Sequence, residues 1–159
     1  MQESIKESEC FLSEVFASIQ DGISVLDTNL NIVRVNPTIG KEFEDKAPLV
    51  GKKCYEVYHG RTSPCDACPT CRTIETGKAD YEVVPKTGPG GKVVGWIDLY
   101  SFPLIDDTTG KLKGVIEYVR EITDANARKA AEKNHAESPK ESADNEAPAV
   151  VTTTSATEI

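Results

Sequence analysis

Four of the chain's five cysteines gather in one short stretch as Cys54, Cys65, Cys68 and Cys71, separated by ten, two and two residues. Thiolates are soft ligands that bind zinc and iron–sulfur clusters. Three cysteines at two-residue intervals with one remote cysteine are typical of iron–sulfur ligation, whereas zinc sites more often use two separated pairs. The spacing therefore predicts that all four cysteines are metal ligands, for an iron–sulfur cluster or for zinc.

Two other interpretations fit the same residues. Cys68 and Cys71 have the spacing of a dithiol redox switch, although no thioredoxin-like βαβ pattern surrounds them. Alternatively, Cys54 is a small buried hydrophobic residue and the remaining cysteines are structural or idle. The chain would then be a protein-interaction or dimerisation module whose sheet face docks a partner. Cys10 stands apart from the stretch and enters none of these hypotheses.

Composition limits the classes of function. With 159 residues, 38% of them hydrophobic, the chain has room for one domain with a core plus a tail. Its net charge of -8 opposes direct binding to nucleic acid or to an anionic membrane surface. The sequence contains neither a signal peptide nor a run of about 18 apolar residues, so we expect a cytoplasmic protein. In that reducing compartment, clustered cysteines favour metal binding or redox chemistry over structural disulfides.

The cysteines are expected at the start of a helix. Pro69 suits the first helical position and Gly77 the C-terminal cap, so Cys68 would be the N-cap and Cys71 would lie one turn on. Exposed amide N–H groups and the positive end of the helix dipole favour thiolate over thiol there. Cys65 would lie just upstream, and Cys54 would arrive from the preceding helix.

The first part of the chain predicts a helix and a hairpin. Residues 3–19 have an amphipathic pattern. Its apolar residues are Ile5, Leu12, Val15, Phe16 and Ile19. Residues 23–26 and 32–35 read as two short strands joined by a tight turn. Asn36 and Pro37 then offer an N-cap and a first helical residue for the next helix.

The later part predicts three antiparallel strands, at residues 81–84, 93–104 and 112–119, because turn-rich segments separate these β-branched and aromatic runs. Residues 125–133 contain strong helix formers with almost no large apolar side chain. Residues 136–159 are polar and lack periodicity, so we expect a disordered acidic tail.

This order of elements resembles the PAS family over about residues 12–126. The motifs that carry the resemblance are Asp21-Gly22-Ile23, Val33-Arg34-Val35-Asn36-Pro37, Leu49-Val50-Gly51-Lys52 and Glu121-Ile122-Thr123-Asp124, where Glu121 stands in place of the usual Asp. The resemblance implies an α+β fold with a five-stranded antiparallel sheet and short helices on one face. The domains would be an N-terminal helix (1–19), a PAS sensor domain (20–124), an exit helix (125–135) and the tail (136–159).

A resemblance to PAS domains also implies a function. Such a domain senses a small ligand, a redox state or a partner, and it signals through flanking helices to a downstream protein. The amino-terminal helix would pair between the subunits of a homodimer. A cysteine-bearing branch of the family is similar at Cys54, Pro64, Cys65, Cys68 and Pro69, with Cys71 as an addition. We therefore expect a non-enzymatic sensor that reads its input at the cysteines.

Other cofactors and catalysis are not expected. A haem-binding PAS domain would place a histidine at 69–76, where there is none, and the Gly-Arg-Asn-Cys-like motif of flavin-binding relatives departs after Gly60-Arg61. Trp96, Tyr100 and Phe102 recur at period two, so they share one strand face, which favours a core role. Trp96 and Tyr100 are the candidate contacts for a bound ligand or cofactor. We identify no catalytic residues.

Overall fold

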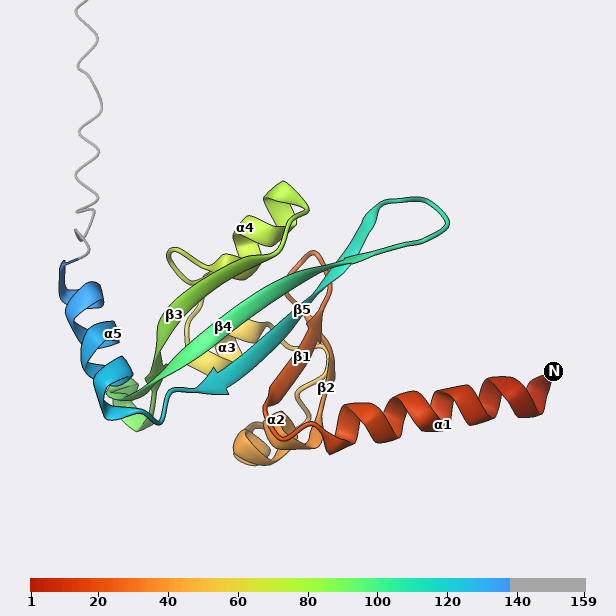
Figure 1. The fold of residues 1–159 in the computed structure, drawn as a ribbon, viewed down its shortest axis with the longest axis horizontal. Coiled ribbons are helices and arrows are strands. Elements are labelled where there is room, and N and C mark those ends of the chain that lie inside the picture. Colours follow the sequence, from red (N-terminus) through yellow and green to blue (C-terminus); the bar gives the residue numbers. More distant parts are fainter. Residues whose placement is uncertain (138–159) are drawn as a thin grey trace, which may run out of the picture.

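Five antiparallel strands form one sheet in the order β2-β1-β5-β4-β3 (Figure 1). The computed structural model describes residues 1–137, and the predicted acidic tail lies outside them from residue 138 onward. The strands are β1 (Gly22–Leu26), β2 (Ile32–Val35), β3 (Asp80–Thr87), β4 (Val93–Ile105) and β5 (Leu112–Glu121). The helices are α1 (Gln2–Ser18), α2 (Pro37–Glu42), α3 (Cys54–His59), α4 (Pro69–Thr76) and α5 (Ala125–Glu137), with short 3-10 turns at Glu44–Lys46 and Pro89–Gly91. The predicted fold class is confirmed, and the exit helix runs two residues further than expected.

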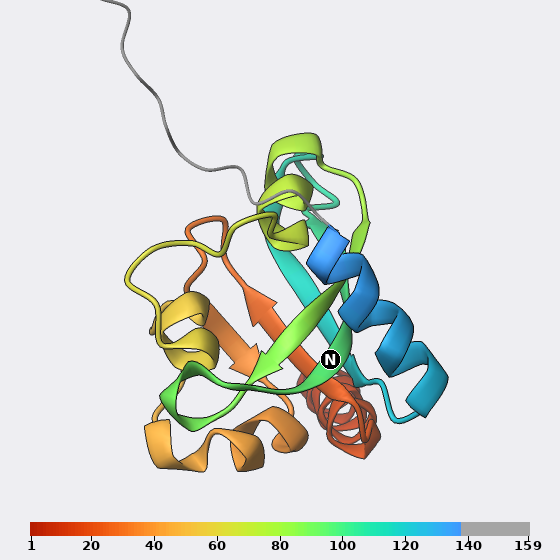
Figure 2. The ribbon, with the colours of Figure 1, turned by 90° about the vertical axis from the view of Figure 1, so that its left-hand side faces the viewer.

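Strand register assigns side chains to two faces of the sheet. Glu117 of β5 lies opposite both Ser24 of β1 and Ser101 of β4, so these three side chains share one face. Tyr100 and Tyr118, one residue along, point the other way. Figure 2 shows α2, α3 and α4 on one side of the sheet and α5 on the other. We call the two sides the helix-covered face and the outer face.

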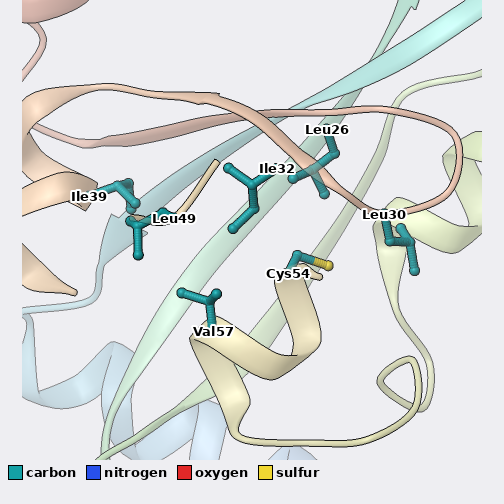
Figure 3. Close-up of a cluster of buried hydrophobic side chains, with 7 residues drawn as sticks. All are labelled: Leu26, Leu30, Ile32, Ile39, Leu49, Cys54 and Val57. Carbon is teal, nitrogen blue, oxygen red and sulfur yellow. The ribbon is translucent and has the colours of Figure 1, made fainter. Parts of the chain in front are cut away.

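The apolar core lies between the helix-covered face and the short helices. Close-packed apolar side chains from β1, β2, α2 and α3 meet there (Figure 3). The buried members of this cluster are Leu26, Leu30, Ile32, Ile39, Leu49, Cys54 and Val57. Burying this apolar surface is the main favourable term that holds α2 and α3 on the sheet.

Asn36 joins the hairpin to the helices. Its side-chain oxygen accepts hydrogen bonds from the Ile39 amide, as the N-cap of α2, and from the Ile23 amide of β1. Its amide nitrogen donates to the carbonyls of Ile19 and Asp21. The predicted N-cap is confirmed, and the same side chain also fixes the segment that leads from α1 into the sheet.

Helix α1 extends away from the sheet (Figure 1), and none of its described residues is buried. Near its C-terminal end, Arg34 of β2 donates to the Ser13 hydroxyl and lies over the Phe16 ring. Its exposed apolar side chains include Ile5, Phe11, Leu12 and Val15. The predicted helix is present, and the sheet does not cover its apolar stripe. Within residues 1–137, no helix has both the length and the apolar character needed to cross a membrane.

Candidate functional site

The first turn of α4 brings Cys68 and Cys71 together. Cys68 is the N-cap with extended backbone angles, Pro69 is the first helical residue, and Gly77 ends the helix in the left-handed region at φ 68°. The predicted helix start and end are therefore confirmed. Burial raises the pKa of Cys71, and interactions with the neighbouring Cys68 thiol add to that rise. A pair of thiols one helical turn apart is thus preformed.

Arg72, the residue after Cys71, fixes this turn to the rest of the fold. Its guanidinium forms two hydrogen bonds of 2.8 and 2.9 Å with the Asp80 carboxylate of β3 and one of 2.9 Å with Glu82. It also donates to the Ala67 carbonyl at 2.8 Å, just before the N-cap. A planar guanidinium that bonds a carboxylate through two nitrogens holds a defined geometry. The loop that carries Cys68 is therefore held against the helix it begins.

Cys54 and Cys65 lie near this pair but do not complete a ligand set. Cys54 is buried in the apolar cluster as the first residue of α3 (Figure 3), and Cys65 is half-buried in the loop before α4. Among residues 1–137, no three histidine, cysteine or acidic side chains come together as ligands for a metal ion. The residues present do not fit an iron–sulfur cluster or zinc in this arrangement, so a four-cysteine metal site stays a prediction from spacing.

Burial keeps several of the thiols protonated. It raises the pKa of Cys71 to about 12, with a further contribution from the adjacent Cys68. It also raises the pKa of Cys65 to about 11 and that of Cys54 further still. The expectation that the helix terminus favours thiolates is therefore wrong for Cys71 and Cys65, because loss of hydration outweighs the helix dipole there.

A chain of buried polar side chains runs from α4 to the middle of the sheet. Thr70 donates to the Glu117 carboxylate of β5 at 2.5 Å, and Ser101 of β4 donates to the Thr70 hydroxyl at 2.9 Å. On the other side of Glu117, Ser24 shares a hydrogen bond of 2.6 Å with the Tyr58 hydroxyl of α3. Burial raises the pKa of Glu117, and the bond from Thr70 opposes that rise. This carboxyl therefore favours its neutral form.

This buried carboxyl was not predicted, although the sequence holds a signal for it. Within the strand-like run from Leu112, an alternating pattern puts Glu117 on the same face as Val115 and Val119. An acid between two β-branched residues on an inward face is unusual and indicates a function or a specific partner. The hydroxyl partners come from β4 and α4, which no local pattern connects to β5.

The predicted aromatic face is the outer face of the sheet. Trp96 is 4% exposed and lies 5.3 Å from the ring of His135 in α5. Tyr100 lies between Tyr81, at 4.7 Å, and Phe102, which is 42% exposed. A cleft of about 410 Å³ lies between α5 and this face. Its lining includes Tyr81, Val83, Asp98, Ala127, Ala130 and His135. The shared face is confirmed, and ligand contact by Trp96 or Tyr100 remains a prediction.

Comparison with known proteins places this architecture. The family model described as PAS fold matches residues 16–127. A PAS domain of an HTR-like protein from Haloarcula marismortui is 16% identical with a TM-score of 0.58, over 76% of this chain and 97% of that chain. The PAS domain of BvgS from Bordetella pertussis is 20% identical with a TM-score of 0.57, over 82% of this chain and 96% of that chain.

A third structure, described as a dimer of VqmA from Vibrio cholerae, is 22% identical with a TM-score of 0.55, over 70% of this chain and 51% of that chain. No curated protein matches the sequence. At these identities the structural likeness establishes the fold alone. The family match covers more than half of the sequence, and PAS domains are sensory and signal-transduction modules. The chain belongs to the PAS family.

Proposed function

We propose that this PAS domain senses redox state at the Cys68–Cys71 pair and signals through its flanking helices, α1 and α5. The observation that carries the proposal is the placement of Cys68 at the N-cap of α4 and of Cys71 one turn later. Residues at the N-cap and one turn later lie within the Cα separation that a disulfide requires. The pair can therefore be joined by a displacement confined to the first turn of α4.

The oxidant that we propose is a small-molecule disulfide. The Cys68 thiolate attacks one sulfur of the oxidant, and the first small thiol leaves. The Cys71 thiolate then displaces the second small thiol from the mixed disulfide, so that the two protons of the pair end on the two thiols released. Because burial raises the pKa of Cys71 to about 12, its thiolate is scarce at neutral pH. We expect the exchange to accelerate as pH rises.

Metal binding by Cys54, Cys65, Cys68 and Cys71 is the alternative that their spacing predicts, although within residues 1–137 no three such ligands come together. Burial is the main cause that raises the pKa of Cys54, and the charges of Glu117, Cys68 and Cys65 add to that rise. Ligation of a cation would require these thiols to lose their protons. Metal analysis of protein purified without oxygen distinguishes this candidate, because a thiol switch requires no stoichiometric zinc or iron.

We further propose that α1 pairs with α1 of a second copy. The exposed side chains of Ile5, Leu12 and Val15 recur at intervals of seven and three residues along the helix, as in a coiled-coil seam. The Vibrio cholerae neighbour is described as a dimer. Such a homodimer would carry the signal in the cytoplasm to a downstream protein, with neither nucleic acid nor membrane as a direct partner.

Cysteine variants test the redox proposal. The full chain is equilibrated in glutathione buffers of increasing oxidation, and free thiols are then blocked and counted by mass. The native chain and the control Cys10→Ser, which alters an exposed cysteine of α1, should each lose two blockable thiols together. Cys68→Ser and Cys71→Ser should lose this paired step. Unchanged thiol counts in the native chain across all buffers would refute the proposal.

A further inference from the structure

A residue between the two cysteines is tied to the centre of the sheet. Thr70, the second residue after Cys68, is fully buried, and its hydroxyl donates to Glu117 at 2.5 Å. The same hydroxyl accepts a hydrogen bond from Ser101 at 2.9 Å. Thr70 therefore uses both its donor and an acceptor site inside the protein. The first turn of α4 cannot shift without disturbing a hydrogen bond of Glu117.

Glu117 lies on the strand that continues into the exit helix. β5 ends at Glu121, and α5 begins at Ala125. The Ile122 amide between them donates to the carbonyl of Trp96, whose ring is in contact with His135 of α5. Asp124 accepts hydrogen bonds from the first amides of α5. Glu117 therefore lies four residues before Glu121, where the connection from β5 to α5 begins. A displacement of β5 at Glu117 is close to that connection.

Oxidation of the pair must change the first turn of α4. The two sulfurs become joined by a bond of about 2.05 Å, which draws together the residues on either side of Thr70. A closely packed interior responds to such a displacement by changing partners and does not deform continuously. The buried hydrogen bonds of Thr70 with Glu117 and Ser101 lie in this turn. A carboxyl left there without its partner would be strongly disfavoured.

We propose that Glu117 is the positioning residue through which the state of the Cys68–Cys71 pair reaches β5 and α5. In the reduced state, the Thr70–Glu117 hydrogen bond fixes the position of α4 on β5. Disulfide formation weakens this bond, and the shift of β5 changes how α5 lies on the outer face. This inference rests on the redox proposal above, and it assigns to a buried carboxyl the link between input and output.

Two threonines of α4 provide a matched test. Thr70 and Thr73 are both fully buried on α4, but Thr70 donates to Glu117 whereas Thr73 donates to the backbone carbonyl of Ser101 at 3.5 Å. Thr70→Val and Thr73→Val remove one hydroxyl each with little change in shape. Glu117→Met removes both carboxyl oxygens, including the one that accepts from Thr70, and keeps a side chain of similar length. Trp96, the chain's single tryptophan, reports on α5 through its contact with His135.

The measurement is tryptophan fluorescence of the full chain across glutathione buffers, with the disulfide counted in parallel by mass. We expect emission to change together with disulfide formation in the native chain and in Thr73→Val. In Thr70→Val and Glu117→Met the disulfide should form while most of the emission change is lost. Because coupling is reciprocal, these two variants should also shift the dithiol–disulfide equilibrium constant by about fivefold or more.

The possible results distinguish the role of Glu117 from the redox proposal for Cys68 and Cys71. An emission change of equal size in all four proteins, with equal equilibrium constants, would overturn the role of Glu117 and leave the redox proposal standing. A disulfide that forms in the native chain without any emission change would do the same. Failure of the native chain to form the disulfide would overturn the redox proposal itself, and this inference with it. If Glu117→Met does not fold, Thr70→Val alone decides the outcome.

Discussion

At the scale of single residues, the structure differs most from the sequence predictions where burial changes the protonation of a side chain. The spacing of Cys68 and Cys71 indicated a thiol pair, and Pro69 correctly placed it at a helix start. The protonation of Cys71 was not predictable, because it depends on hydration lost to parts of the fold that are distant in sequence. Glu117 was not predicted for the same reason, since its hydroxyl partners come from other elements.

The buried Glu117 carboxyl predicts a pH dependence of stability. Its folded pKa is raised above the ordinary value of 4.5, so its contribution is fully present below that value and is lost as pH rises through the folded pKa. Burial also raises the pKa of its electrostatic neighbours Cys54, Cys65 and Tyr58, which titrate well above neutrality. Glu117→Gln should therefore gain stability relative to the native chain between about pH 5 and pH 8. Urea unfolding at both pH values measures this, and an equal difference at both would contradict it.

Cys54 predicts a packing effect that is separable from redox chemistry. Its side chain is buried among Leu30 and Val57 in the apolar cluster (Figure 3). Cys54→Ala should lower the free energy of unfolding by about 1 kcal/mol without removing the paired loss of thiols in oxidising buffer. Cys10→Ala on the exposed surface of α1 is the control and should change it by less than about 0.5 kcal/mol. Loss of the paired oxidation in Cys54→Ala would place this cysteine in the switch.

At the scale of elements, the sequence correctly predicted the features that depend on turn and cap residues close together in the chain. The β1–β2 hairpin, the N-cap at Asn36 and both ends of α4 follow from turn and cap residues, and the structure confirms them. The position of α5 on the outer face had no such signal, since its apolar content is low and a single alanine, Ala131, is its buried residue. Contacts between elements far apart in the chain decide such placements.

Two glycines, one at the end of α4 and one inside α2, should respond in opposite ways to substitution by alanine. Gly77 ends the helix at φ 68°, a conformation that disfavours any Cβ, so Gly77→Ala should destabilise the fold by about 1 kcal/mol. Gly40 lies within α2 without a positive φ, and the space that a Cβ would occupy there is open. Gly40→Ala should therefore stabilise the fold, by up to about 1 kcal/mol. Thermal unfolding of both variants checks the pair, and a stabilising Gly77→Ala would contradict the cap.

At the scale of the whole molecule, α1 and α5 flank the PAS domain at its two ends in the chain. α1 extends from the sheet beside β2, and α5 follows directly from β5 (Figure 1). The family match and the strand order make this a PAS domain, and the resemblance had predicted that from the order of elements. The sequence predicted the apolar stripe of α1. It did not predict which surface covers the stripe, because the pattern of one chain does not identify a partner surface.

The α1 stripe predicts the oligomeric state. Leu12→Glu places a charge at the middle of the exposed apolar residues and should convert a homodimer to a monomer. The control is Lys6→Glu, which changes the charge of α1 beside the apolar seam. Ser8 does not serve as a control position because it lies within the seam. Sedimentation equilibrium measures the mass of each protein. A native chain that is monomeric at all concentrations would contradict pairing through α1.

The central claim is that Cys68 and Cys71 form the redox-active pair, and peptide mapping of the oxidised native chain tests it most directly. Trypsin cleaves after Arg61 and Arg72, so residues 62–72 form one peptide that holds Cys65, Cys68 and Cys71. After equilibration with oxidised glutathione and blocking of free thiols, fragmentation of this peptide identifies the linked cysteines. We predict a disulfide between Cys68 and Cys71 with Cys65 blocked. A bond from Cys65 to either residue, or three blocked thiols, would contradict the claim.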